Sequence, residues 1–421
     1  MARLTIRTLL ATTLVFTLAA CGGVPMSRSP GSAGAQVTIP QRPAGSPASE
    51  AGLQQWVQAF RPAALSAGIT PATFDRSMAL ARYDSSIVAL DGRQSEFSRP
   101  IWAYLDDAAS GSRVSIGREK AAQLSGTLGA IEGRYGVPRE IVLAVWGMES
   151  NFGANRGSTR IIPALATLAY DGRRGQFFGN ELIAAMRIVQ SGDTTPEGLV
   201  GSWAGAMGHT QFMPSSYLAH AVDFTGDSRR DIWSNDPTDS LASTAAYLRQ
   251  AGWQPGMPWG VEVVLPANFN YALSGKNNRQ SGASWSSMGV RTANGTAMPR
   301  WAGSILVPAG ARGPAFLISD NFRAILDYNT SDSYALGVSI LGDRIAGRAG
   351  VQGSWPRGDR PLSNSEKAEI QRLLTQRGFY RDEVDGKLGA KSTEAIRAFQ
   401  QSIGATPDGY ADARLLGQLR G

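Results

Sequence analysis

One stretch of this sequence, residues 141–148, is apolar on every side of the helix that it would form. Gly136 and Pro138 precede it and Gly153 follows it, and such residues are typical of helix starts and ends. A helix that is apolar all round has no face to present to water, so it must be buried. The stretch therefore predicts a mainly helical domain built around an interior helix.

One carboxylate, Glu149, stands at the end of this apolar run. Burial disfavours its anion, and so does the negative end of the helix dipole, so both effects raise its pKa. A carboxyl with a raised pKa can donate a proton near neutral pH, which makes Glu149 a candidate general acid. The alternative is a helix-terminal glutamate that turns outward into water.

Enzymes that cleave glycosidic bonds usually hold a second carboxylate across the bond from the acid. The nearest acids here are Glu140, on the same predicted helix, and Asp171, beyond a loop. Neither stands where a partner of Glu149 is expected. A single acid is compatible with a reaction that needs no activated water, so it favours intramolecular attack over hydrolysis.

Residues 201–217 form a second informative stretch, rich in glycine and alanine, which allow a ligand to approach the backbone closely. Side chains that offer hydrogen bonds are Ser202 and Gln211. Apolar faces for a sugar ring come from Trp203, Phe212 and Met213. A tightly packed structural loop would have the same composition.

The chain begins with a pattern typical of an export signal, since Arg3 and Arg7 precede a short apolar run. The run closes in Leu-Ala-Ala-Cys at residues 18–21, which resembles the processing site of bacterial lipoproteins. That resemblance implies a lipid anchor on Cys21 and a cell-envelope protein facing the periplasm, and Gly22 favours the outer membrane. The alternative is an ordinary secretory signal with an incidental cysteine.

Composition narrows the chemistry further. One cysteine and two histidines exclude an internal disulfide framework and most zinc or iron sites, so no cofactor is expected. The formal net charge is +7, which in a cytoplasmic protein would suggest nucleic acid. Export makes nucleic acid an unsuitable partner, and the charge instead suits anionic envelope components.

Changes in composition along the chain predict five parts. Residues 22–49 are rich in Gly, Pro, Ser and Ala and read as a flexible tether, while helical periodicity begins near Glu50. Short β-like pieces occur around residues 261–306, and a Gly/Pro/Arg-rich linker precedes a small C-terminal unit. The predicted parts are a signal (1–20), a tether (21–49), a large domain that holds the candidate catalytic residue (50–347), a linker (348–361) and a small C-terminal domain (362–421).

The C-terminal unit combines amphipathic helices with two Asp-Gly turns, at residues 385–386 and 408–409. With Thr393 and the Phe-Gln pair at residues 399–400, this spacing resembles the helical peptidoglycan-binding module of wall hydrolases. The alternative is a generic three-helix appendage.

The larger part resembles the lytic murein transglycosylases of the membrane-bound B type over residues 50–347. The matching motifs lie at residues 94–97, 100–104, 149–153, 204–217 and 328–329. The resemblance implies a mainly α (α+β), lysozyme-like fold with a small β element. It also implies non-hydrolytic cleavage of the MurNAc–GlcNAc β-1,4 bond of peptidoglycan glycan strands, which leaves 1,6-anhydromuramoyl ends.

By the same resemblance, Glu149 acts first as general acid and then as base. The expected substrate-binding residues are Ser202, Gln211, Met213, Tyr247, Tyr328, Asn329, Arg173 and Arg174. Two other functions stay open, a hydrolytic muramidase of the lysozyme type and a non-catalytic peptidoglycan-binding scaffold.

An aspartate-rich segment, residues 223–231, is similar to the start of a calcium loop. Its candidate ligands are Asp223, Asp227 and Asp231. However, Ser228 and Ser234 stand where the EF-hand has glycine and glutamate, although Asp236 or Asp239 could substitute for the missing acid. We favour a metal-free turn, and we expect structural roles for His209 and His220.

Overall fold

The computed structural model describes residues 37–92, 99–171 and 173–421. The export signal, Cys21 and the motif at residues 94–97 lie outside the described residues. Within the described residues, we find no helix with the length and apolar character that crossing a bilayer requires.

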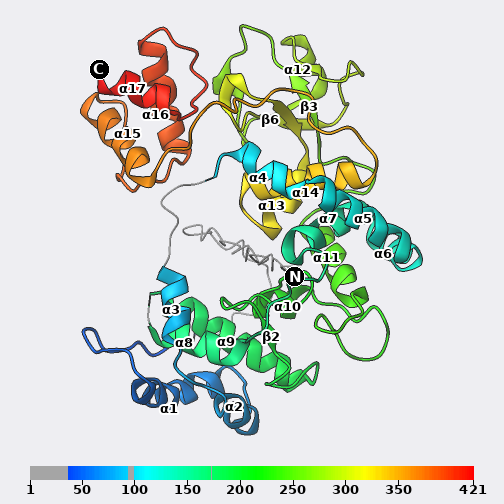
Figure 1. Ribbon diagram of the computed structural model, residues 1–421, viewed down its shortest axis with the longest axis vertical. Coiled ribbons are helices and arrows are strands. Elements are labelled where there is room, and N and C mark those ends of the chain that lie inside the picture. The colour runs from blue at the N-terminus through cyan, green and yellow to red at the C-terminus, as the bar shows by residue number, and fades with distance from the viewer. Residues whose placement is uncertain (1–36, 93–98, 172) are drawn as a thin grey trace, which may run out of the picture. The chain divides into compact units, whose positions relative to one another are not determined.

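One group of helices packs around a core that contains Leu53, Phe60, Leu165 and Phe178. Thr70 caps the second of these helices, as its sequence predicts, because its side chain accepts a hydrogen bond from the Thr73 amide. The helices are α1 (Glu50–Ser66), α2 (Pro71–Met78), α3 (Ser85–Gly92), α8 (Ile161–Asp171), α9 (Gly175–Ser191) and α10 (Pro214–His220). Figure 1 shows α8 and α9 lying side by side.

The last part of the predicted tether belongs to this folded group. Ile39 is 1% exposed and packs against Gly179 of α9, and its amide donates to Gln176 Oε1 at 3.2 Å. Trp56 Nε1 donates to the Pro40 carbonyl at 2.7 Å. The prediction of a flexible tether to residue 49 is therefore wrong at its C-terminal end. It rested on the low apolar content of the segment, but one buried isoleucine and two hydrogen bonds hold residues 39 and 40 against the helices.

A second group of helices surrounds α7, whose residues 142–145 have no exposed surface. The predicted buried helix is therefore confirmed. Glycines of α14 permit the close contact, since a Cβ on Gly342 would lie 2.9 Å from Ile141 Cδ1. The group comprises α4 (Ile101–Ala108), α5 (Gly111–Gln123), α6 (Ser125–Tyr135), α7 (Arg139–Ser150), α11 (Thr238–Gln250), α13 (Asp320–Tyr328) and α14 (Asp332–Ile345).

The β element is an antiparallel sheet with strand order β4-β6-β7-β3-β5. Its strands are β3 (Gly260–Val264), β4 (Arg279–Ser281), β5 (Arg291–Thr292), β6 (Ala302–Leu306) and β7 (Ala315–Ile318), with the short helix α12 (Gly282–Ser287) beside them. Val263, Trp285 and Leu317 form a small core under this sheet. A separate pair, β1 (Thr159–Arg160) and β2 (Val200–Gly201), is also antiparallel.

The C-terminal unit is the predicted set of three helices, α15 (Asn364–Gln376), α16 (Ala390–Ser402) and α17 (Ala413–Arg420) (Figure 1). Two glutamines hold its Asp-Gly turns in the same way. Gln371 donates to Asp385 Oδ1 and accepts from the Gly386 amide, and Gln400 does the same with Asp408 and Gly409. The two turns thus share one pattern of hydrogen bonds to a glutamine side chain.

Gly157→Ala is expected to destabilise the fold more than Gly192→Ala. Both glycines have positive φ angles, +81° and +84°, so alanine is strained at either position by about 1 kcal/mol. Nothing lies within 4 Å of a Cβ on Gly192, whereas a Cβ on Gly157 would lie 2.2 Å from the Gly201 carbonyl oxygen. Urea denaturation should show a further loss of about 2 kcal/mol for Gly157→Ala. Equal losses would contradict the close approach of Gly157 to Gly201 in β2.

Candidate active site

Helix α7 ends in strained backbone. Asn151 caps it with φ 51°, and Phe152 follows with φ 56°, so the helix ends before Gly153, where the sequence predicted its stop. Left-handed conformations are uncommon for residues other than glycine and persist only where the surroundings impose them. Ser150 supplies part of that constraint, because its hydroxyl donates to the His209 carbonyl at 2.5 Å and accepts from the Gly153 amide at 3.0 Å.

Glu149 occupies the last turn of α7, where its Oε1 accepts a hydrogen bond from the Tyr334 hydroxyl at 2.5 Å. Burial raises the pKa of Glu149 to about 7, and the hydrogen bond from Tyr334 opposes that rise. The predicted upward shift is confirmed, and the alternative of a carboxylate turned outward into water is wrong. The residue as a whole keeps partial exposure.

Beyond Glu149, the side chains of Tyr334, Tyr328 and Tyr247 follow one another in a row of ring contacts. The Tyr334 and Tyr328 rings are nearly parallel, at 4° and 6.5 Å between centroids, and Tyr247 lies 4.9 Å from Tyr328. The Tyr328 hydroxyl donates to the Thr210 carbonyl at 2.6 Å. The structure thus brings the predicted residue Tyr328 near the candidate acid, with Tyr247 packed on its far side, and burial raises the pKa of Tyr328, which keeps its hydroxyl a proton donor.

Tyr334 has no role in the sequence-based prediction. It stands in the first turn of α14, 185 residues from Glu149 in the chain, and only the packing of α14 on α7 joins them. In the sequence, the feature that could have indicated a role for Tyr334 is its position shortly after the motif residues Tyr328 and Asn329.

The loop that contains Ser202 and Gln211 folds back on itself. Met207 bridges both Gly201 and Phe212, so the two ends of the loop lie side by side. Gln211 has φ 54°, and its Nε2 donates to the carbonyls of Arg156 and Gly208. Ser202 Oγ accepts from the Ala206 amide at 3.1 Å. Among the described residues, the Ser202 hydroxyl hydrogen and Gln211 Oε1 have no recorded partner, so both can serve a ligand.

Met213 and Asn329 occupy the ends of helices. Met213 precedes α10, and its Cε lies 3.2 Å from the point that a Cβ added to Gly205 would occupy. Asn329 ends α13, and its Oδ1 accepts from the Ser331 amide at 3.1 Å. The amide nitrogen of Asn329 has no recorded bond within the described part of the chain.

The predicted pair Arg173 and Arg174 is bound to an acid that sequence reasoning missed. Asp91, with a side chain only 6% exposed, accepts from Arg173 Nε at 2.6 Å and also from Arg174. The arginine side chains stay 45% and 35% exposed. Two guanidinium groups against one carboxylate leave one positive charge for an anionic ligand.

His209 is structural, as expected. Its Nδ1 accepts from Trp146 Nε1 at 3.1 Å, and its Nε2 lies 2.8 Å from the Ser234 carbonyl, so Nε2 carries the hydrogen. Burial lowers the pKa of His209, which favours the neutral ring. The ring therefore supports the backbone after Glu149 rather than exchanging protons.

Comparison with known proteins identifies the domains. The model of the transglycosylase SLT domain matches residues 52–343, and that of a peptidoglycan binding domain matches residues 363–419. The chain belongs to the SLT transglycosylase family. This confirms the predicted family, its lysozyme-like, mainly helical fold with a small β element, and the C-terminal helical domain. The exact domain boundaries stay predictions.

Several relatives are similar to this transglycosylase. Membrane-bound lytic murein transglycosylase B of Escherichia coli (strain K12) is 35% identical over 213 residues, which span 50% of this chain and 58% of the relative. SltB3 from Pseudomonas aeruginosa, solved in complex with NAG-anhNAM-pentapeptide, is 47% identical with a TM-score of 0.85, over 88% of this chain and 99% of that chain. Escherichia coli Slt35, solved in complex with calcium, is 29% identical with a TM-score of 0.60, over 71% and 94% of the two chains.

The acidic loop of this transglycosylase differs from the predicted ligand set. Carboxylate oxygens of Asp223, Asp227 and Asp239 lie within 4.8 Å of one another, whereas Asp231 caps the amides of Trp233 and Ser234. Asp239 already accepts from three backbone amides, and the bidentate glutamate that ends an EF-hand loop is missing. These residues are therefore a poor fit to a calcium site of that type.

Tyr334→Phe should raise the pKa of Glu149 further above about 7, because the hydrogen bond that it removes favours the charged carboxylate. A bond of about 1 kcal/mol corresponds to about one pH unit. Carbon NMR of the labelled glutamate carboxyls measures this pKa, and Glu149→Gln assigns the signal. Tyr328→Phe is the matched control, since that hydroxyl donates to Thr210 instead. A pKa that falls in Tyr334→Phe would contradict the assigned contact.

Proposed function

We propose that this chain is a lytic transglycosylase that cleaves the MurNAc–GlcNAc β-1,4 bond of peptidoglycan and leaves 1,6-anhydromuramoyl ends. The observation that carries the proposal is Glu149, a carboxyl with a pKa of about 7 that stands at the centre of an SLT transglycosylase domain. Such a group is protonated and ionised in comparable amounts near neutral pH, so it can both donate and accept a proton.

Both halves of the reaction use the same carboxyl. Protonated Glu149 donates its proton to the glycosidic oxygen, and the bond between that oxygen and C1 of the muramoyl residue breaks. The resulting carboxylate accepts the proton of the muramoyl C6 hydroxyl while that oxygen bonds to C1. Glu149 is then protonated again, and no water is consumed. The Tyr334 hydroxyl stabilises the carboxylate between the two proton transfers.

The substrate-binding residues are proposed from the resemblance of their motifs to those of the B-type lytic transglycosylases and from the groups that their side chains offer. Tyr247, Tyr328 and Met213 offer apolar faces, while Ser202, Gln211 and Asn329 offer hydrogen-bonding groups that the protein leaves available. SltB3 was solved with both NAG-anhNAM-pentapeptide and NAG-NAM-pentapeptide, which supports peptidoglycan glycan with a peptide stem as the ligand class. The excess positive charge of Arg173 and Arg174 over Asp91 suits an acidic group of that stem.

Glu149→Gln should lower murein cleavage by about 10³-fold, because the amide can neither donate nor accept the transferred proton. Mass spectrometry of digested sacculi is the measurement, together with sedimentation of the protein with sacculi, which should stay normal. Glu140→Gln, on the same helix, is the matched control and should retain activity.

The same spectra separate the competing functions. A hydrolytic muramidase yields reducing ends that are heavier by one water than anhydro ends, and a non-catalytic scaffold releases no muropeptide. Anhydro products formed normally by Glu149→Gln would overturn the role of this residue.

We also propose that the chain is an envelope lipoprotein that faces the periplasm, anchored through Cys21 in the outer membrane. The signal-like start of the sequence supports this, as does the name of the Escherichia coli relative, which is membrane-bound. The C-terminal domain would hold the enzyme on peptidoglycan.

Cys21→Ser tests the anchor. Cys21 is the single cysteine of the sequence, so its replacement leaves no other thiol to acylate. The natural chain should incorporate labelled palmitate and sediment with membranes, and Cys21→Ser should do neither. A natural chain without label would contradict lipidation.

A further inference from the structure

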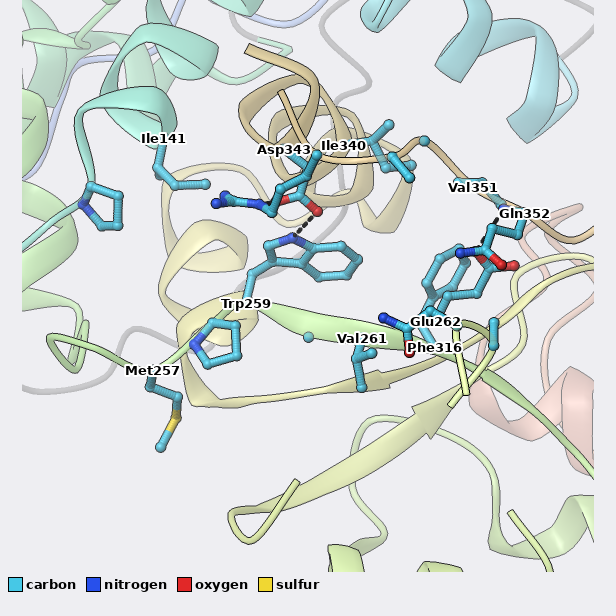
Figure 2. A pocket seen from close by; sticks show the side chains of 18 of the residues that line it. Ile141, Met257, Trp259, Val261, Glu262, Phe316, Ile340, Asp343, Val351 and Gln352 are labelled. Atoms are coloured by element: carbon cyan, nitrogen blue, oxygen red, sulfur yellow. Dashed lines mark hydrogen bonds and ion pairs between the residues drawn. The ribbon is translucent and has the colours of Figure 1, made fainter. Parts of the chain in front are cut away.

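A cavity of about 570 Å³ lies apart from Glu149 and from all the predicted substrate-binding residues. Its walls come from β3, the start of α7, the end of α14 and the first residues of the linker, as Figure 2 shows. Cavities of this size and mixed lining are typical of small-molecule sites. The proposed reaction makes no use of it.

Two carboxylates hold the walls in place. Asp343 accepts from Trp259 Nε1 at 3.0 Å and from Arg348 Nε at 2.8 Å. Glu262 accepts from the linker amides of Gln352, at 2.7 Å, and Gly353, at 2.6 Å. The linker is therefore pinned against β3, and the cavity is formed before any ligand arrives (Figure 2).

The lining combines apolar surface with neutral hydrogen-bonding groups. Met257, Val261 and Phe316 supply the apolar part, and Gln352 adds a side-chain amide (Figure 2). Asn294 is a second amide-bearing residue of the lining. Trp253 also lines the cavity, and its buried indole N–H has no acceptor within the part of the chain that the structure describes. Because that N–H is itself shielded from solvent, the donors available to a ligand are the two side-chain amides.

The net charge of the lining residues narrows the class of ligand further. Asp343 and Glu262 bring two negative charges and Arg348 brings one positive charge, so the lining has an excess negative charge. An acidic stem peptide would be repelled. A neutral N-acetylated sugar has the required features, because its acetyl carbonyl accepts a hydrogen bond, its methyl group is apolar and its hydroxyls bind side-chain amides.

We propose that this cavity binds an N-acetylglucosamine-type residue of the glycan, as a second site separate from the catalytic centre. The choice of glycan rests on the proposed function, whereas the site itself uses none of the residues of cleavage. Because the linker forms one wall, an occupied site would bind the glycan where the catalytic domain meets the linker to the wall-binding domain.

Photo-crosslinking with a diazirine-bearing N-acetylchitotriose tests the site. The whole chain carrying Glu149→Gln is used, so that the probe is not cleaved. Peptide mass spectrometry should find label within residues 256–262 or 348–352, which line the cavity. The control probe is cellotriose with the same diazirine, which lacks the acetyl groups. It should not crosslink to these segments.

Val261→Trp fills the cavity and should abolish this labelling. Val264→Trp is the matched control, since Val264 lies on the same strand, is 50% exposed and does not line the cavity. Gln352→Ala, at an exposed position that does not threaten the fold, should weaken labelling by about fivefold.

Absence of label in both segments at saturating probe, or equal labelling by cellotriose, would overturn the second site. Label within residues 202–213 reports on the proposed active site separately. Its loss, with the cavity still labelled, would count against the proposed function and leave the second site standing.

Discussion

The burial of residues 141–148 of α7 is the constraint on which the rest of the catalytic domain depends. A helix with no exposed face requires neighbours on all sides, and α5, α6, α11 and α14 supply them. Because the helix ends inside this assembly, its last carboxylate emerges where little water can stabilise a negative charge. The pKa of about 7 for Glu149 follows from that placement, with Tyr334 as the opposing influence. Structural burial and chemical competence thus have one physical origin.

The candidate site lies where two separate cores meet. Glu149 and Tyr334 belong to elements of the core around α7, whereas Phe212 belongs to the core around α8 and α9. Tyr328 packs against both cores. A site divided in this way can offer apolar rings from one side and hydrogen-bonding loop groups from the other, which suits the two chemical characters of a sugar chain.

Strained backbone around the site is balanced by buried hydrogen bonds. Asn151, Phe152 and Gln211 have positive φ angles, and each lies in a segment held by side-chain bonds to backbone atoms. His209 links these segments, since Trp146 and Ser234 fix its ring while its carbonyl accepts from Ser150. A neutral, fully bonded imidazole is well suited to this role because it does not change charge near neutral pH.

The sequence by itself determined the buried helix, the unusual carboxylate at its end, the change from helices to a small sheet and the three-helix C-terminal domain. These features are local, because residue type and spacing express them within one segment. Only the tertiary structure decided that Tyr334 contacts Glu149, that Asp91 pairs with Arg173 and Arg174, and that Asp239 rather than Asp231 lies beside Asp223 and Asp227. It also decided that Ile39 is buried and that a second cavity forms beside the linker. Each of these depends on residues distant in the chain, whose meeting is set by how helices and strands pack and leaves no periodic signal in the sequence.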